Sequence, residues 1–433
     1  MSGQVGSITL TQCIDSALIN KNDIKAARTE RIASGLQSEA VLAGYLPKIS
    51  VGYDFRYNIV IPAQIIPVGL FYPVPTDATQ AIKFGTKWQQ NLGLSLYQPL
   101  IDRTVKTHLA ESRINEKIQD ENIVSAEHDL QYEVINSYLV IWLREQQVKA
   151  SVIDTIRTFN TCKLLEAGFN EGRVYESDLN RAKINHNNAL SSFRQSFSEL
   201  VKEKIYMSFL TGISLNKMLV ADYDFKPLMK EGIFAVPDAP LFDSISSVRQ
   251  IILNRELADG REKSERATHL PSLGIEGFVG TNQYTDQFIP ANNTGWYGNS
   301  YVGLSLKLPV ISGRGSGSRI GQLRMQKESL DYRLQDMKAD ITSQNFKLVQ
   351  DIKMLDDQIS LADNNIYLMK SNLELFRERF EKGRINSYDM LSSETDLQKA
   401  VSDIEKLRTE LYLKKLQLIR NSGMLGIFIE RLK

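Results

Sequence analysis

The chain has 433 residues and is close to electrically neutral, with 52 basic and 51 acidic side chains and a net charge of +1. Nucleic-acid-binding proteins present a basic surface, and this balance gives no sign of one. The longest strongly apolar helical stretch, residues 138–143, is far shorter than the roughly 18–20 residues that a membrane-spanning helix needs. The composition therefore argues against nucleic-acid binding and against a helical membrane protein.

The N-terminal residues 1–6 contain no basic segment followed by an apolar core, so no signal peptide is visible. Both a cytoplasmic protein and a chain that begins after a removed or replaced signal would fit this beginning. A helix is then expected over residues 8–44, with Thr11 as its N-cap and Pro47 just beyond its end.

Two stretches of period-2 alternation follow, at residues 48–58 and 88–98, and a proline-rich connection separates them. Alternation over about 10 residues predicts β-strands with one apolar face and one small or polar face. We expect these strands to form a hairpin whose apolar face carries Ile49, Val51, Tyr53, Phe55, Tyr57, Leu92, Leu94 and Leu96.

Proline is absent from residues 100–226 and from residues 310–433, although the chain contains twelve prolines. Because proline inside a helix costs about 3 kcal/mol, its absence permits helices of unusual length. The first tract predicts a long helical hairpin over residues 103–211. Gly168 and Gly172 are expected to end its first helix, as glycine commonly does.

The second half of the chain repeats this plan. Strands are expected at residues 272–282 and 299–308, and a long helical hairpin over residues 318–421 with its turn at Gly383. The sequence therefore predicts a mixed α and β fold built from two structural repeats, residues 1–225 and 226–433, each a helix, a β-hairpin and a long helical hairpin.

An apolar seam with a period of about 3.5 residues runs along the first helix of the second hairpin, which predicts coiled-coil packing against a partner helix. Phe169 and Phe380, at equivalent positions of the two hairpins, are expected inside such cores. The seam consists of Leu348, Ile352, Leu355, Ile359, Ala362, Ile366, Met369, Leu373, Phe376 and Phe380.

The apolar faces of the four strands point to a membrane, because no adjacent helix covers them. Four strands cannot close a barrel, and open sheet edges do not occur in lipid, so three copies would be needed to supply twelve strands. Trp88 and Trp296 precede the second strand of each hairpin and suit an aromatic girdle together with Phe84, Tyr284 and Tyr297. A soluble hairpin layer packed on the helices is the alternative.

The order of these elements resembles that of the TolC-like outer membrane efflux proteins over essentially the whole chain. The resemblance rests on the Leu-Pro pairs at residues 46–47 and 270–271, the strand exits at residues 98–103 and 308–314, and the turns at residues 169–173 and 380–384. It implies a homotrimer in the cell outer membrane, with a twelve-stranded β-barrel continued by a long periplasmic α-helical barrel. The absent signal peptide is then a matter of processing.

The resemblance also assigns roles to the two helical turns. Asp389 matches an acidic ring that narrows the pore, Ser392 stands where a second acidic residue often occurs, and Asp178 matches polar contacts that hold neighbouring hairpins closed. The alternative for both aspartates is a favourable interaction with the helix dipole. The turns would meet a periplasmic adaptor through Gly172, Arg173, Gly383 and Arg384.

No arrangement typical of an enzyme, a metal site or a cofactor site is present. The four histidines lack the spacing of metal ligands, and Cys13 and Cys162 are expected to be small buried thiols. The sequence therefore favours a passive exit duct of a tripartite efflux or type I secretion system, gated at its helical tip and served by an adaptor and an inner-membrane pump. A periplasmic coiled-coil adaptor or scaffold is the alternative.

Overall fold

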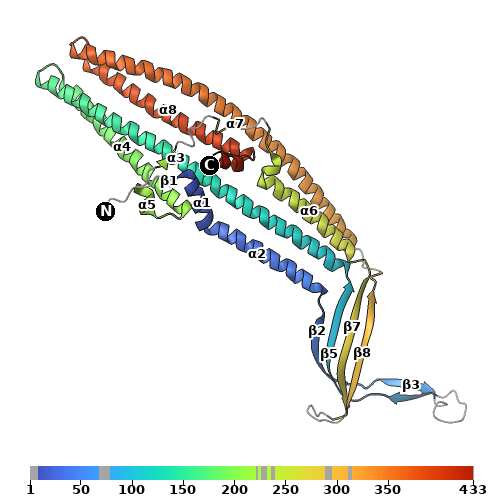
Figure 1. The fold of residues 1–433 in the computed structure, drawn as a ribbon. Helices are drawn as coiled ribbons and strands as arrows, with labels where there is room; N and C mark the ends of the chain where they lie inside the picture. The colour runs from blue at the N-terminus through green and yellow to red at the C-terminus, as the bar shows by residue number, and fades with distance from the viewer. Residues whose placement is uncertain are drawn as a thin grey trace. The chain divides into compact units, whose positions relative to one another are not determined.

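The computed structural model places the chain in two compact units, and each unit draws segments from both halves of the sequence (Figure 1). Unit 1 contains residues 1–31, 117–254 and 330–433, and unit 2 contains residues 32–116 and 255–329. The residues that the structure describes are 8–67, 79–220, 223–225, 232–235, 239–287, 295–310 and 315–432.

Unit 2 contains a four-stranded antiparallel sheet with the order β2-β5-β7-β8 (Figure 1). Its strands are β2 (Lys48–Tyr57), β5 (Trp88–Ile101), β7 (Ser272–Thr285) and β8 (Trp296–Lys307). Each of the four begins within three residues of its expected start. The two hairpins join through the pairing of β5 with β7, so β2 and β8 form the edges of the sheet.

The register of the sheet separates its two faces as the alternation predicts. Directly paired residues share a face, and the pairs Val51 with Leu94, Leu94 with Val279 and Ile275 with Leu304 define what we call the apolar face. Its side chains are strongly exposed in the isolated chain, for example 70% for Ile49 and 82% for Val302. The opposite side, which begins with Ser50 and Gly52 on β2, is called the polar face.

A third hairpin lies within the proline-rich connection between β2 and β5, where no strands were expected. Strand β3 (Ala63–Pro67) pairs antiparallel with β4 (Thr79–Lys83). These strands were missed because Pro62 precedes β3 and Pro67 is its last residue, and the five residues between these limits show no clear alternation. Part of the expected connection, residues 68–78, lies outside the described residues.

The two long helical hairpins appear at the expected positions. The first consists of α3 (Arg103–Asn170) and α4 (Glu176–Thr211), and the second of α7 (Gly315–Glu381) and α8 (Ser387–Asn421) (Figure 1). The expected seam of α7 packs inward in unit 1, where Leu348, Leu355 and Leu373 are buried. The long-helix prediction is therefore confirmed.

The first expected helix is in fact two, α1 (Leu10–Asn20) and α2 (Asn22–Leu42). Lys21 takes an extended conformation between them, and the Asn20 side chain donates a hydrogen bond to the Thr211 carbonyl at 3.0 Å. The N-cap is Thr9 rather than Thr11, because Thr9 and Gln12 form a reciprocal capping box.

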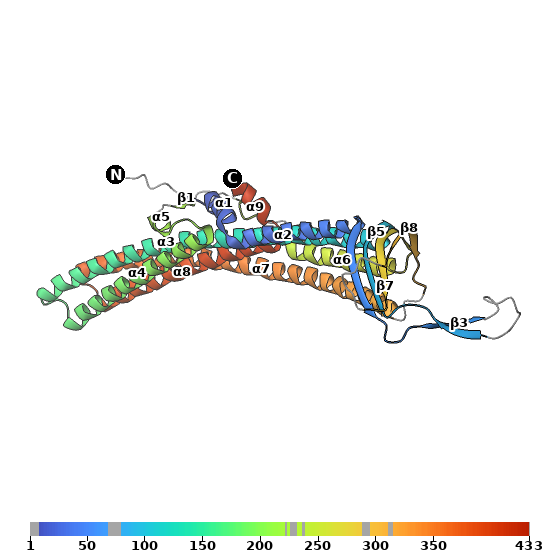
Figure 2. The ribbon, with the colours of Figure 1, turned by 90° about the horizontal axis from the view of Figure 1, so that it is seen from below.

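The main hydrophobic core of unit 1 surrounds Tyr138, which is fully buried. Its hydroxyl donates towards two backbone carbonyls, those of Ile8 and Asp224, each at 2.9 Å. These residues belong to β1 (Ile8–Thr9) and β6 (Tyr223–Asp224), a short parallel pair. Helix α9 (Leu425–Leu432) lies beside α1 in Figure 2, and both contribute side chains to this core.

The described elements also include the helices α5 (Leu215–Val220) and α6 (Ser246–Ala267) and two 3-10 helices, Ala43–Tyr45 and Phe242–Ser244. Across the described ranges, every helix lacks the uninterrupted apolar length needed to cross a bilayer.

Candidate functional site

The turns of the two helical hairpins have the same backbone geometry. In the first, the Gly172 and Arg173 N–H groups donate to the carbonyls of Phe169 and Gly168 at 2.9 and 2.8 Å. In the second, the corresponding donors are Gly383 and Arg384, again at 2.9 and 2.8 Å. This pair of bonds is the Schellman motif, which needs a left-handed residue at its centre. Gly172 has φ +72° and Gly383 has φ +67°.

The predicted residues of the turns are largely on the surface. Asp389 and Ser392 are exposed, and Asp178 is half-buried in the first turn of α4. Arg173 is exposed and forms an ion pair with Glu171, and Arg384 is exposed as well. Within one chain these side chains do not form a cluster of their own, so a ring of Asp389 carboxylates needs further copies.

The two returning helices start differently. Asn386 caps α8, because its side-chain oxygen accepts a hydrogen bond from the Asp389 N–H at 2.9 Å. Tyr175 stands at the equivalent position of α4 and makes no side-chain cap. The two turns also contact each other, since the Arg181 guanidinium of α4 lies 4.8 Å above the ring of Tyr388 on α8.

A hydrophobic cluster behind the turns joins the two hairpins. It contains side chains from all four helices of the two long hairpins, and Phe380 packs against it. Phe169, its counterpart, is 39% exposed, so the expectation of a core position was wrong for this residue. The buried members of the cluster are Leu165, Val174, Leu179, Ala182, Ile366, Leu373, Met390, Leu391, Leu397 and Ile404.

Glu394 of α8 is the most deeply buried carboxylate near the turns, with 2% of the residue exposed. Its Oε1 accepts hydrogen bonds from Thr161 of α3 at 2.9 Å and from Arg377 of α7 at 3.3 Å. The Arg157 guanidinium of α3 lies 3.7 Å from the same oxygen and donates to the Glu394 backbone carbonyl at 3.1 Å. We call these four residues the Glu394 clamp.

Burial determines the electrostatics of the clamp. Desolvation raises the pKa of Glu394, although Arg157, Thr161 and Arg377 each act to lower it. Arg157 shares its charge with Asp154, to which it also forms an ion pair. Sequence reasoning missed the clamp because its members come from three helices and have no common spacing.

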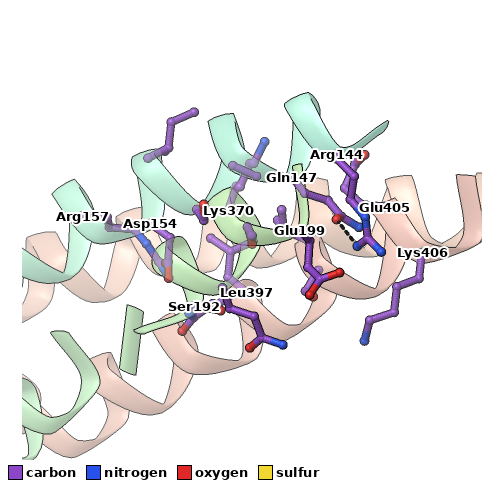
Figure 3. Close-up of a pocket in the computed structure, with 18 residues that line it drawn as sticks. Arg144, Gln147, Asp154, Arg157, Ser192, Glu199, Lys370, Leu397, Glu405 and Lys406 are labelled. Carbon is purple, nitrogen blue, oxygen red and sulfur yellow. Dashed lines mark hydrogen bonds and ion pairs between the residues drawn. The ribbon is translucent and has the colours of Figure 1, made fainter. Parts of the chain in front are cut away.

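A cavity of about 610 Å³ lies next to the clamp, between the two hairpins. Figure 3 shows that its lining side chains come from α3, α4, α7 and α8, including Arg157 and Asp154 at one end and Arg144 and Glu405 at the other. Most of the lining residues have polar side chains, Lys370 and Lys406 among them, but apolar atoms form the larger part of the cavity surface. The hairpins are therefore not packed together along their whole length.

Trp88 and Trp296 lie on the apolar face of the sheet, near the ends of their strands. Trp88 pairs directly with Tyr57, whose ring centroid is 4.4 Å from its own, and Trp296 pairs with Gln283. Tyr284 and Tyr297 contact each other at 6.4 Å, but the register puts both on the polar face. The expected grouping of these tyrosines with the tryptophans was wrong, because Tyr284 alternates with the apolar positions of β7 and Tyr297 alternates with those of β8.

The apolar face also carries a polar ladder that the alternation did not indicate. The Tyr53 hydroxyl donates to Gln90 at 2.7 Å, and Gln90 donates to Gln283 at 2.9 Å. Both glutamines are buried, so their amides are satisfied within the sheet.

Comparison with known proteins shows which family and which solved structures this chain resembles. A family model described as outer membrane efflux protein matches residues 245–424. Residues 245–424 are therefore similar to the outer membrane efflux protein family. The sequence resemblance is therefore confirmed, and so is the predicted location in the cell outer membrane.

Solved structures extend this likeness to the rest of the fold. CusC matches with a TM-score of 0.77 and 14% identity, covering 96% of this chain and 92% of the other. VceC from Vibrio cholerae matches with 0.74 and 12%, covering 96% of both chains. CmeC, an outer membrane channel of Campylobacter jejuni, matches with 0.70 and 15%, covering 98% and 89%. No curated protein sequence matches the chain.

CusC and CmeC are described as channels, in agreement with the sequence prediction that this chain is no enzyme. Among the described residues, no group of three or more His, Cys, Asp or Glu side chains is arranged to hold a metal ion. Cys13 and Cys162 are free thiols, and burial raises the pKa of Cys13 to about 12.

Proposed function

We propose that this protein is a passive exit duct of an efflux or type I secretion system, formed by three copies of the chain. The observation that carries the proposal is the four-stranded sheet with one exposed apolar face. Leu304 and Leu306 of this face are 73% and 71% exposed, a degree that favours contact with lipid rather than water. The match of residues 245–424 to the outer membrane efflux protein family supports an efflux role.

Both edges of the sheet need a partner strand for the sheet to be stable in a membrane. Strands β2 and β8 are its edges, and unpaired backbone groups are not tolerated in hydrocarbon. Pairing of β8 with β2 of the next copy satisfies both edges, and three copies give a closed barrel of twelve strands. In this arrangement the polar face lines the channel, and Trp88 and Trp296 belong to an interfacial girdle.

Helix α7 supports a second contact between copies. Besides its buried seam it carries a separate apolar stripe, in which Met354, Leu361, Leu368 and Leu375 recur every seven residues and Phe346 precedes them. These side chains are between 47% and 68% exposed in the single chain. A heptad stripe of this kind suits packing against a helix of a neighbouring copy, which gives a helical barrel.

The helical turns are proposed as the gate and the adaptor contact. Three Asp389 carboxylates around the axis would attract cations at a constriction, with Ser392 one turn away and Asp178 in the neighbouring hairpin. The Glu394 clamp holds α8 against α3 and α7, and the adjacent cavity leaves room for the hairpins to separate. Gly172, Arg173, Gly383 and Arg384 stand on the exposed turns, where an adaptor joined to an inner-membrane pump would bind.

The two structural repeats, residues 1–225 and 226–433, complete the proposal. Their equivalence is supported by the matching Schellman turns, whose hydrogen bonds have the same lengths.

The decisive experiment is reconstitution of the purified chain. We expect a detergent-extracted trimer that conducts ions in planar lipid bilayers. A monomer that stays soluble without detergent and conducts no ions would instead support the periplasmic adaptor or scaffold.

A further inference from the structure

Three aromatic side chains lie on the polar face of the sheet, where small or polar residues were expected. Tyr97 is on β5, Phe278 on β7 and Tyr301 on β8. Phe278 pairs directly with Tyr301, and Tyr97 pairs with Glu276, so the four residues occupy two adjacent rows of the same face. We call Tyr97, Phe278 and Tyr301 the aromatic cluster.

Glycines allow two of these rings to lie along the sheet. A Cβ atom on Gly93 would come within 2.4 Å of the Phe278 ring, and one on Gly274 within 2.8 Å of the Tyr97 ring. Phe278 also stacks on Tyr301, with ring centroids 5.9 Å apart and planes inclined by 23°. Rings that rest on glycine turn their other π face to the space above the sheet.

A carboxylate stands within this group of rings. Glu276 is half-buried and follows Phe278 by two positions on the same strand and face. Among the described residues it makes no hydrogen bond or ion pair. The closest cation by register is Lys48, which lies beyond Tyr97 on β2, two strand spacings or about 9.6 Å away.

From this juxtaposition we propose that the aromatic cluster binds organic cations that carry aromatic rings. The π faces of the three rings attract cations and stack on flat groups, and Glu276 adds a negative charge at the same place. The inference rests on the proposed function, because the polar face lines the channel only in the closed assembly. Aromatic organic cations that pass through the channel would bind transiently at the aromatic cluster.

The test uses the purified full-length assembly in planar bilayers, with tetraphenylphosphonium as the probe. We expect this cation to reduce the current, while tetraphenylborate, an anion of the same shape, and tetramethylammonium, a cation without rings, do so far less. Phe278→Leu should weaken the block about two- to thirtyfold, because cation–π interactions are typically worth about 0.5–2 kcal/mol. Glu276→Gln should also weaken it, because it removes the negative charge beside the rings. Asp54→Asn, on the same face but two rows from Phe278 and three rows from Glu276, should leave the block unchanged.

The current without any probe reports the proposed channel by itself, so failure of the channel and failure of the site are distinguishable. Equilibrium dialysis of tetraphenylphosphonium against the detergent-solubilised protein measures binding even if no channel forms. Equal affinity of the unsubstituted protein, Glu276→Gln and Phe278→Leu would overturn the proposal, as would equal block by all three probes.

Discussion

The role of the Glu394 clamp in gating can be tested quantitatively with the substitution Glu394→Ala. The substitution removes the hydrogen bond from Thr161 to a charged acceptor, a type of bond worth about 1.5–3 kcal/mol. Arg377 is 39% exposed, so its ion pair adds only about 0–1 kcal/mol. The desolvation that raises the pKa of Glu394 offsets part of this sum.

A net loss of about 2–3 kcal/mol follows, which favours separation of the hairpins by about 30- to 140-fold. Single-channel recording of open probability in planar bilayers measures this shift directly. Glu394→Gln keeps an acceptor for Thr161 and should stay much closer to the unsubstituted protein.

The matched control is Glu405→Ala. Glu405 also lines the cavity, but its partner Arg408 is in the same helix at 3.1 Å, so no link between helices is lost. The reasoning is refuted if Glu394→Ala and Glu405→Ala change the open probability equally, or if neither changes it.

Four further predictions concern the gate, the assembly and the turns. Asp389→Ala should reduce block of the current by multivalent cations, and an unaltered block would remove Asp389 from the constriction. Because burial raises the pKa of Glu394 above its ordinary value of 4.5, the packed state binds a proton more tightly than a separated state with this carboxyl in water. The resulting stabilisation is present below pH 4.5 and is lost as pH rises through the raised pKa; the open probability should therefore increase with pH in this window, but not in Glu394→Gln. Leu361→Asp should convert the trimer to folded monomers by light scattering, whereas Ser360→Asp, on another face of α7, should not. Gly383→Ala should lower the free energy of unfolding in urea by about 1 kcal/mol through its left-handed φ, against no loss for Gly426→Ala within α9.

Local patterns explain why the strands and long helices could be predicted. Residues 48–57 and 296–307 alternate with a period of 2, which favours strands, and the tracts after residues 99 and 309 lack proline, which permits long helices. Both effects are local to the sequence. The same alternation also fixes the two faces of the sheet. These features need no knowledge of distant contacts.

The parts that could not be predicted depend on distant contacts. The clamp joins Thr161 and Glu394, which are 233 positions apart in the sequence. At the break between α1 and α2, the Asn20 side-chain amide donates a hydrogen bond to the Thr211 carbonyl, 191 positions away. Phe169 and Phe380 occupy equivalent positions but differ in burial, because the hydrophobic cluster includes only Phe380.

The unequal caps of the two turns have a kinetic consequence. Asn386 secures the start of α8 with a side-chain hydrogen bond, a type of bond typically worth about 1 kcal/mol, and Tyr175 provides none for α4. The first helical turn of α4 should consequently fray about five times more often than the first turn of α8. Residues 171–178 should therefore be cleaved by a protease, or rearranged by a binding protein, more readily than the matching turn of the second hairpin.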